Sequence, residues 1–380
     1  MTSTVQTSAV APATNRFYVL DGLRGIGAMF VMFYHYTDSA HYSFLRGAWF
    51  AVDMFFFLSG FVIYHAYANK ILGGMTAGVY VNRRLARLAP TVTVGVLLGA
   101  GAILLHYAAI NQAIDPVKFA IVHIGNILFI PAFLDYHIPA IGLGPLFPTN
   151  TPLWSIFFEM VVSLGFVILV RWSKMWLAIA TIATFIIFFL SCLWLSQTTG
   201  RPLTGDLGWS IETFFYGFPR AVGPFICGML IYSLTQGPGP LNRTLPIWRN
   251  SISAYIIYAG LFAILLFPIR LNGLYPFIAL SILTPLLILF GARSQPKSRW
   301  LVALSDWLGQ VSFPLYCFHV PLRRLTESTL DAVGLTDMRW RDEMLLSFAV
   351  AILVSSLIMI ALNRLRAGRR VSTWLKPITG

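Results

Sequence analysis

The stretch YVLDGLRGIGAMFVMFYHY, residues 18–36, has the length and apolar character of a membrane-spanning helix. It nevertheless contains Asp21, Arg24 and His35, although a charged side chain at the centre of such a helix costs roughly 2.5 to 3.5 kcal/mol. At about 100° per residue, Arg24 and His35 project only about 20° apart, and Asp21 lies within about 60° of both. The three side chains share one face, which predicts that this face lines a watery passage through a helix bundle.

The same three residues also permit a purely structural interpretation. Asp21 and Arg24, at positions i and i+3, could neutralise each other near the inner surface while His35 extends toward the outer one. The shared face favours the passage, because groups that serve only as surface anchors have no reason to align.

The composition extends the membrane assignment to the whole chain. Of 380 residues, 57% are hydrophobic and 11% are charged, and the mean hydropathy of +0.73 lies far above that of soluble domains. The three cysteines all lie within apolar runs, which argues against a disulfide framework or a metal cluster. We therefore expect an integral membrane protein with no bound metal and no resident cofactor.

Segments of about 20 mostly apolar residues, the length needed to cross a bilayer, recur along the chain. They predict an all-α fold, a polytopic membrane helix bundle of about ten transmembrane helices. The candidate spans lie near residues 17–38, 49–69, 90–110, 153–170, 175–196, 213–234, 252–269, 274–292, 303–325 and 343–362. An eleventh apolar segment, residues 119–134, is shorter and includes His123 and Pro131, so a re-entrant or interfacial piece is expected there.

The distribution of Lys and Arg sets the orientation of these spans. With the N-terminus inside, the inner loops hold most of the basic residues, whereas an eleventh span would move the basic C-terminus outside. Both termini are therefore expected to be cytoplasmic, and the net charge of +13 reflects this orientation rather than nucleic-acid binding. The expected parts are a disordered cytoplasmic tail (1–16), a single transmembrane domain (17–362) and a basic cytoplasmic tail (363–380).

Two later spans also carry ionisable groups. In the fourth, Trp154 is expected at the outer interface, and Glu159, about two turns deeper, needs a partner on another helix, either His35 or an arginine. The ninth carries Tyr316 and His319, and a lone intramembrane histidine is more often a hydrogen-bonded packing residue than a catalyst. Glu159 is therefore the stronger functional candidate.

The inner segment between the second and third spans, VNRRLARLAPTV, places Arg84 and Arg87 at i and i+3 on one helical face. Two guanidiniums in this arrangement could bind phosphates through paired hydrogen bonds. The alternative is that both residues are ordinary anchors on the cytoplasmic side, and the sequence alone favours the anchors.

Five short motifs follow one another along the chain. They are Arg24 and His35 separated by ten residues, DMFFFLSGFVIYHAY with Ser59, RRLARLAP, PLWSIFFEM, and LGQVSFPLYCFHVPL. In this order they resemble the motifs of the acyltransferase-3 family of bacterial membrane acyltransferases, from about residue 17 to 362. The last motif departs from the family pattern at Pro314, Cys317 and Phe318. Each motif is weak alone, but five in a fitting order are specific.

The resemblance implies transfer of an acyl group, commonly acetyl from acetyl-CoA, to a hydroxyl of a carbohydrate such as an exopolysaccharide, an O-antigen or a lipid-linked sugar. It implies a multi-pass protein of the bacterial inner membrane, with acyl-CoA as co-substrate and polysaccharide synthesis or export machinery as a fitting partner. No nucleic-acid partner is expected.

Under this resemblance, His35 is the candidate base for the acceptor hydroxyl, because an imidazole titrates near neutral pH. Glu159, preferred over Asp21, would orient the imidazole. Arg24 lies about 16 Å deeper along the helix, so it would either stabilise the oxyanion or bind CoA phosphates. The acyl-CoA candidates are Arg84, Arg87 and Arg24, and the supporting positions are Asp21, Ser59, Trp154, Tyr316 and His319.

A secondary transporter is the alternative function, because intramembrane Asp, Arg, His and Glu also form ion and substrate pathways. Inverted repeats with paired broken helices would favour it, and the sequence shows none. We therefore expect the enzyme.

Overall fold

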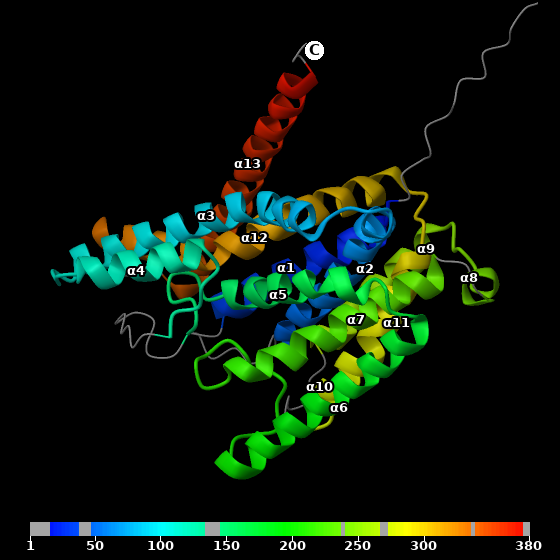
Figure 1. Cartoon of the computed structure of the whole chain (residues 1–380). Helices are drawn as coiled ribbons and strands as arrows, with labels where there is room; N and C mark the ends of the chain where they lie inside the picture. Colours follow the sequence, from blue (N-terminus) through cyan, green and yellow to red (C-terminus); the bar gives the residue numbers. More distant parts are fainter. Residues whose placement is uncertain are drawn as a thin grey trace, which may run out of the picture.

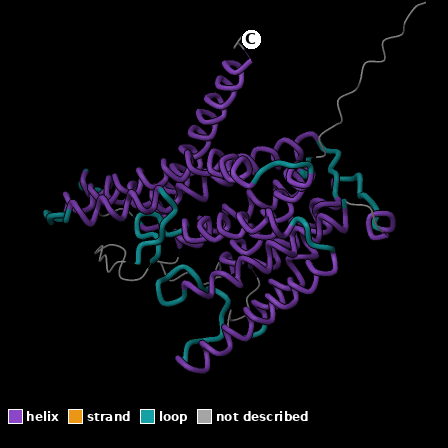
Figure 2. Tube along the Cα trace, viewed as in Figure 1, coloured by secondary structure: helices purple, strands orange, loops and turns teal. Residues whose placement is uncertain are grey.

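The computed structural model describes residues 16–37, 47–133, 145–236, 240–266, 273–335 and 339–374. Over these ranges the fold is helical, and β pairing is limited to two isolated bridges, Pro145 with Ser210 and Trp248 with Ser294 (Figure 2). The prediction of an all-α fold is confirmed for this part of the chain. The predicted N-terminal tail lies outside the described residues except for Arg16.

Each predicted span overlaps a helix or a run of joined helices. The bounds are α1 Tyr18–Thr37, α2 Phe50–Leu72, α3 Ala77–Ala109, α5 Leu153–Leu169, α6 Lys174–Thr199, α7 Gly217–Thr235 after the short η3 Phe214–Tyr216, α9 Ser251–Leu266, α10 Tyr275–Ile278 joined through η4 Ala279–Leu283 to α11 Thr284–Arg293, α12 Arg299–Ala332 and α13 Trp340–Trp374. Two further helices, α4 Pro116–Ile127 and α8 Pro240–Thr244, lie between them. Because α4 has only 12 residues, the eleventh apolar segment does not form a helix long enough to cross a bilayer.

Six of the described helical segments are long and apolar enough to cross a membrane. They include α2, α3, α6 and α13, together with η3–α7 and α10–η4–α11. The helices α5 and α9 are apolar but shorter, and α1 and α12 carry many of the polar site residues. The protein is therefore a multi-pass helical membrane protein, and within its apolar bundle two helices, α1 and α12, carry many of the polar side chains of the site.

The helices α1 and α12 pack along each other near the middle of the molecule, while α13 projects from the bundle (Figure 1). Gly25 allows the close approach, because a Cβ at that position would lie 2.6 Å from the backbone oxygen of Leu308. Such small residues bring membrane helices into backbone contact. The charged face of α1 predicted from the sequence is therefore turned toward α12.

A second close contact joins α2 and α7. A Cβ at Gly60 would lie 1.9 Å from the backbone oxygen of Phe225, so only glycine fits there. Beside this contact, Asp53 of α2 accepts a hydrogen bond from Arg220 Nε of α7 at 2.8 Å, and both side chains are buried. Because removing either partner would leave a buried charge, this ion pair fixes the relative position of the two helices.

Prolines inside α3 and α12 have different consequences: in α3 the proline does not begin the helix, and in α12 it frees a backbone oxygen for another partner. Helix α3 begins at Ala77 and runs through Pro90, where the third span was predicted to begin, so Arg84 and Arg87 belong to the same helix as that span. In α12, Pro321 has no N–H to donate to Cys317 four residues earlier. The freed Cys317 oxygen instead accepts a 2.6 Å hydrogen bond from Asn150 Nδ2, which ties the segment before α5 to α12.

Candidate active site

A cavity of about 310 Å³, the first cavity, opens among α1, α2, α3, α5, α12 and α13. Its charged lining residues are Arg16, Arg24, Arg84, Arg87 and Glu159. Four guanidiniums against one carboxylate make this a site for an anionic ligand, and the volume lies at the lower end of the range for small-molecule sites.

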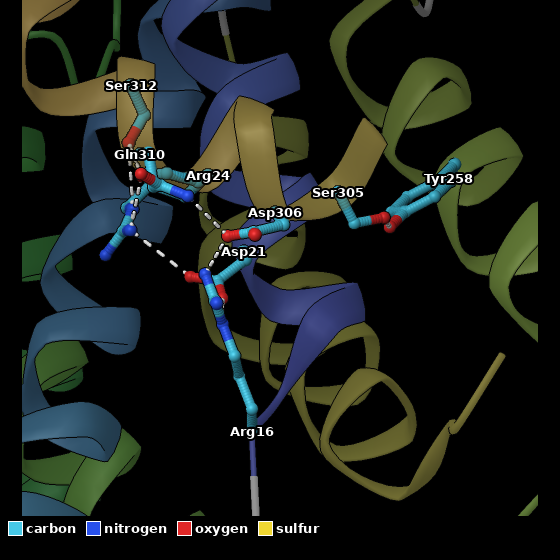
Figure 3. A network of polar contacts seen from close by, with 9 residues as sticks. Arg16, Asp21, Arg24, Tyr258, Ser305, Asp306, Gln310 and Ser312 are labelled. Atoms are coloured by element: carbon cyan, nitrogen blue, oxygen red, sulfur yellow. Dashed lines mark hydrogen bonds and ion pairs between the residues drawn. The ribbon is translucent and has the colours of Figure 1, made fainter. Parts of the chain in front are cut away.

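Arg24 is held in the first cavity by α12 (Figure 3). Its Nε donates to Ser312 Oγ at 2.9 Å, and its Nη2 donates to the Gly309 oxygen at 2.6 Å. Asp21 accepts from Arg24 at 3.2 Å and from Arg16 at 3.2 Å, and Arg16 also pairs with Asp306 (Figure 3). The Asp21–Arg24 ion pair, which the purely structural interpretation of the sequence predicted, is therefore present. Arg24 also contacts a second helix, α12, and lines the first cavity.

Glu159 lies on another wall of the first cavity, between α2 and α3. Its Oε1 accepts from Ser59 Oγ at 2.7 Å and from Arg84 Nη2 at 2.9 Å. Arg84 is only 3% exposed, and its Nε is buried with no hydrogen-bond partner in the described structure. This donor belongs to a residue that lines the cavity, so an anionic ligand could satisfy it.

The expectation that Glu159 orients His35 is wrong in this structure. Glu159 bonds to Ser59 and Arg84 of neighbouring helices, whereas His35 lies beside His319, and the two groups line different cavities. The partner of Glu159 is thus an arginine, which was the other option that the sequence left open.

Trp154 is 6% exposed, and the Arg220 guanidinium lies 4.9 Å from the centre of its ring, so Trp154 is buried within the bundle. The next residue, Ser155, forms a 2.7 Å hydrogen bond with the hydroxyl of Tyr316, and both line the first cavity. The stacking of Trp154 on Arg220 therefore fixes the turn of α5 that joins α12 at Tyr316.

His35 and His319 form a direct pair across α1 and α12. His35 Nδ1 lies 2.8 Å from the Val31 oxygen and 3.1 Å from His319 Nε2, and His319 Nδ1 lies 3.1 Å from the Leu315 oxygen. A carbonyl only accepts, so His319 carries its proton on Nδ1, and the single Nδ1–H of His35 is shared between the Val31 oxygen and Nε2 of His319. In this tautomer, Nε2 of His35 is the basic nitrogen of the pair.

His35 lines a second cavity, of about 410 Å³. The second cavity is lined by His35, Ala102, Ile103, His106, Thr151, Val320, Arg323, Arg324, Glu327, Ser328 and Asp331.

The single passage predicted from the sequence is therefore divided into two cavities in this structure. Tyr316 and Ser155 line the first, whereas Val320, one turn further along α12, and Thr151, in the turn just before α5, line the second. His319, fully buried, lies at this dividing wall.

Comparison with known proteins assigns the family. Residues 17–362 match the acyltransferase-3 family, described as an acyltransferase domain. The chain belongs to the acyltransferase-3 family. It is also 34% identical over 170 residues to "Protein 2 in picA locus" of Rhizobium radiobacter. The matched segment covers 42% of this chain and 83% of that protein. No solved structure matches the chain.

The family motifs meet in pairs within the bundle. Arg24 of the first motif contacts Gly309 and Ser312 of the last. His35 contacts His319, and Ser155 contacts Tyr316. The remaining contact brings Ser59, Arg84 and Glu159 together from three helices. Motifs far apart in the acyltransferase-3 sequence thus build the walls of the first cavity and the histidine pair at its end.

Several residues with clear structural roles escaped the sequence reasoning. Arg220 and Asp53 are buried charges within apolar segments, and that placement is itself a signal for a paired group. Arg323 lies within the predicted span 303–325, and it donates to the His35 backbone oxygen and to Glu327 Oε1, the latter at 2.6 Å. Ser155 and Ser312 lie in the motifs PLWSIFFEM and LGQVSFPLYCFHVPL, but neither was named as a site residue, because a serine in a membrane helix is common.

Proposed function

We propose that this acyltransferase-3 protein moves an acyl group, acetyl in the simplest case, from cytoplasmic acyl-CoA to a hydroxyl of a carbohydrate such as an exopolysaccharide, an O-antigen or a lipid-linked sugar. The proposal places it in the bacterial inner membrane with ten spans and both termini in the cytoplasm. Polysaccharide synthesis or export machinery would supply its acceptor.

One observation carries the proposal: an arginine-rich cavity and a histidine-lined cavity are lined by residues one turn apart on α12, Tyr316 and Val320. CoA is rich in phosphate, so it suits a cavity lined by Arg24, Arg84 and Arg87. A sugar hydroxyl needs a base, and His35 lines the other cavity. The two substrates would then approach the wall from opposite sides.

The chemistry follows from the tautomer of the histidine pair. Nε2 of His35 takes the proton of the acceptor hydroxyl, and the hydroxyl oxygen forms a bond to the thioester carbonyl carbon. The carbon–sulfur bond then breaks, and the CoA thiolate leaves and takes up a proton. The Val31 oxygen and His319 Nε2 both accept from His35 Nδ1–H, so they support the imidazolium that forms, as an orienting group does in a catalytic triad.

Acyl transfer by the purified protein in lipid nanodiscs tests this proposal. Radiolabelled acetyl-CoA is supplied together with glycolipid and polysaccharide extracted from a strain that lacks the protein, and the ester product is counted and identified by mass. We expect transfer by the wild type, and a loss of about 10²- to 10⁴-fold for His35→Ala at unchanged thermal stability.

Two results would contradict the proposal. Equal rates for His35→Ala and the wild type would remove His35 from catalysis. A complete lack of transfer to any glycan, with no acyl ester missing from the surface glycans of the deletion strain, would favour the transporter. A nanodisc separates no compartments, so transfer observed there cannot arise from transport.

A further inference from the structure

The second cavity has a different charge character from the first. Arg323 and Arg324 are matched by Glu327 and Asp331, so the charged groups of its lining balance. In the first cavity, cationic groups outnumber acids even when Asp21 and Asp306 at its edge are counted. The two cavities therefore differ in the net charge of the ligand that each would favour.

The two arginines of the second cavity are already engaged by the protein. Arg323 Nε donates to Glu327 Oε1 at 2.6 Å, and Arg324 Nη1 donates to the Pro148 and Thr149 oxygens at 3.1 and 3.3 Å. These contacts and the bond from Arg323 to the His35 oxygen hold α12 to α1 and to the segment before α5. A ligand carboxylate or phosphate would have to compete with the Arg323–Glu327 pair and would also face Asp331.

The rest of the lining suits hydroxyl groups. Thr151 and Ser328 supply hydroxyls, His35 and His106 supply ring nitrogens, and Asp331 is an exposed carboxylate at the rim. Ala102, Ile103 and Val320 provide apolar surface. Apolar walls with a few placed donors and acceptors bind a compact polyhydroxyl ring, and about 410 Å³ is within the range of small-molecule sites.

We infer that the second cavity is the acceptor subsite and that it selects an uncharged sugar residue over a uronic acid or a phosphorylated sugar. This inference rests on the proposed function and gives its acceptor a chemical class. The sugar lies between α3 and the outer half of α12, where the residues from Val320 to Asp331 recur at helical spacing, and it presents one hydroxyl to His35.

Binding without donor tests the subsite separately from catalysis. Calorimetry on the protein in nanodiscs compares the methyl glycosides of glucose, galactose and N-acetylglucosamine with those of glucuronic and galacturonic acid. We expect at least one neutral glycoside to bind, and to bind at least about tenfold more tightly than its matched uronic acid. Asp331→Asn should weaken that binding, and Asp331→Lys should reverse the preference toward the uronic acid.

Glu212→Lys is the matched control, because Glu212 is an exposed acid that pairs with Arg201 and does not line the second cavity. It should leave both affinities unchanged. Tighter binding of the uronic acid by the wild type, no binding of any neutral glycoside, or equal effects of Asp331→Lys and Glu212→Lys would each overturn the inference. Neutral sugar binding without acyl transfer would support the subsite and refute the proposed enzyme, so the two failures are distinguishable.

Discussion

The residue that most changes the chemistry of this site is His319, which the sequence marked only as a supporting or packing group. It is fully buried, and its two ring nitrogens face two different partners, the Leu315 oxygen and His35 Nδ1. The first contact fixes its tautomer, and that tautomer turns Nε2 into the acceptor for His35. His319 is thus a positioning residue whose two contacts can be separated by substitution.

A matched pair of variants separates them. His319→Gln places an amide oxygen near the position of Nε2 and keeps the contact with His35, whereas His319→Asn places an amide near Nδ1 and keeps only the contact with Leu315. We expect His319→Gln to retain much of kcat and His319→Asn to lose about tenfold or more, with KM for both substrates nearly unchanged. Steady-state kinetics with thermal unfolding of both variants checks this.

A packing role for His319 predicts a different pattern. Both variants would then lose thermal stability, and their rates would fall together or in the reverse order. Equal kcat values for His319→Gln and His319→Asn would therefore remove the histidine pair from the mechanism.

At this scale the sequence predicted which residues share a helix face better than which residues of different helices touch. The periodicity of one helix places Asp21, Arg24 and His35 on one face, and the structure turns that face to α12. Periodicity carries no information on the rotation of neighbouring helices about their own axes. The carboxylate assigned to His35 was therefore the wrong partner, and a second histidine takes its place.

At the scale of the elements, α3 links Arg84 and Arg87, which the sequence predicts to lie on the cytoplasmic side, to the transmembrane bundle. It is one helix from Ala77 to Ala109, and it carries Arg84 and Arg87 into the first cavity. The sequence split this helix at Pro90, since proline commonly ends helices. Its continuity places both arginines on a helix of the bundle, Arg84 buried and Arg87 exposed, with both lining the first cavity, which favours ligand binding over the anchor role.

Arg83 provides a matched control on the same turn of α3, because it is exposed and does not line the first cavity. We expect Arg87→Ala and Arg84→Lys to raise KM for acyl-CoA by about tenfold or more, because each removes guanidinium contacts with phosphate. The acceptor KM should stay unchanged, and Arg83→Ala should resemble the wild type. The measurement is initial rate against donor concentration in nanodiscs, at two salt concentrations.

If these arginines were only cytoplasmic anchors, the three substitutions would affect membrane insertion alike and leave the donor KM alone. Similar KM values for Arg87→Ala and Arg83→Ala would return Arg84 and Arg87 to the anchor role.

At the scale of the whole molecule, composition and hydropathy were enough to place the helices, because lipid demands apolar segments of a minimum length. They were not enough to show that the predicted passage is closed at His319, since that depends on side-chain packing between α5 and α12. Direct transfer requires the acyl end of the donor to pass this wall. Movement of Tyr316 and His319 is therefore part of the proposed reaction, as gating is in many enzymes.

The proposed reaction also requires the two cavities to face opposite sides of the membrane, and chain topology decides this. Cys192, Cys227 and Cys317 are all buried, so single cysteines added at exposed loop positions can be labelled against a low background. With ten spans, Gln112→Cys and Leu335→Cys lie outside, whereas Trp172→Cys and Lys297→Cys lie in the cytoplasm. We expect a membrane-impermeant maleimide to label the first two in cells with a permeabilised outer membrane, and the other two only after the inner membrane is opened.

A span at 119–134 would leave Gln112 outside but exchange the sides of Trp172, Lys297 and Leu335. That pattern would keep Arg84 and His35 on the sides given by ten spans but would move the C-terminus across the membrane. It would therefore refute the ten-span topology, on which the transfer from cytoplasmic acyl-CoA to an outer acceptor is based.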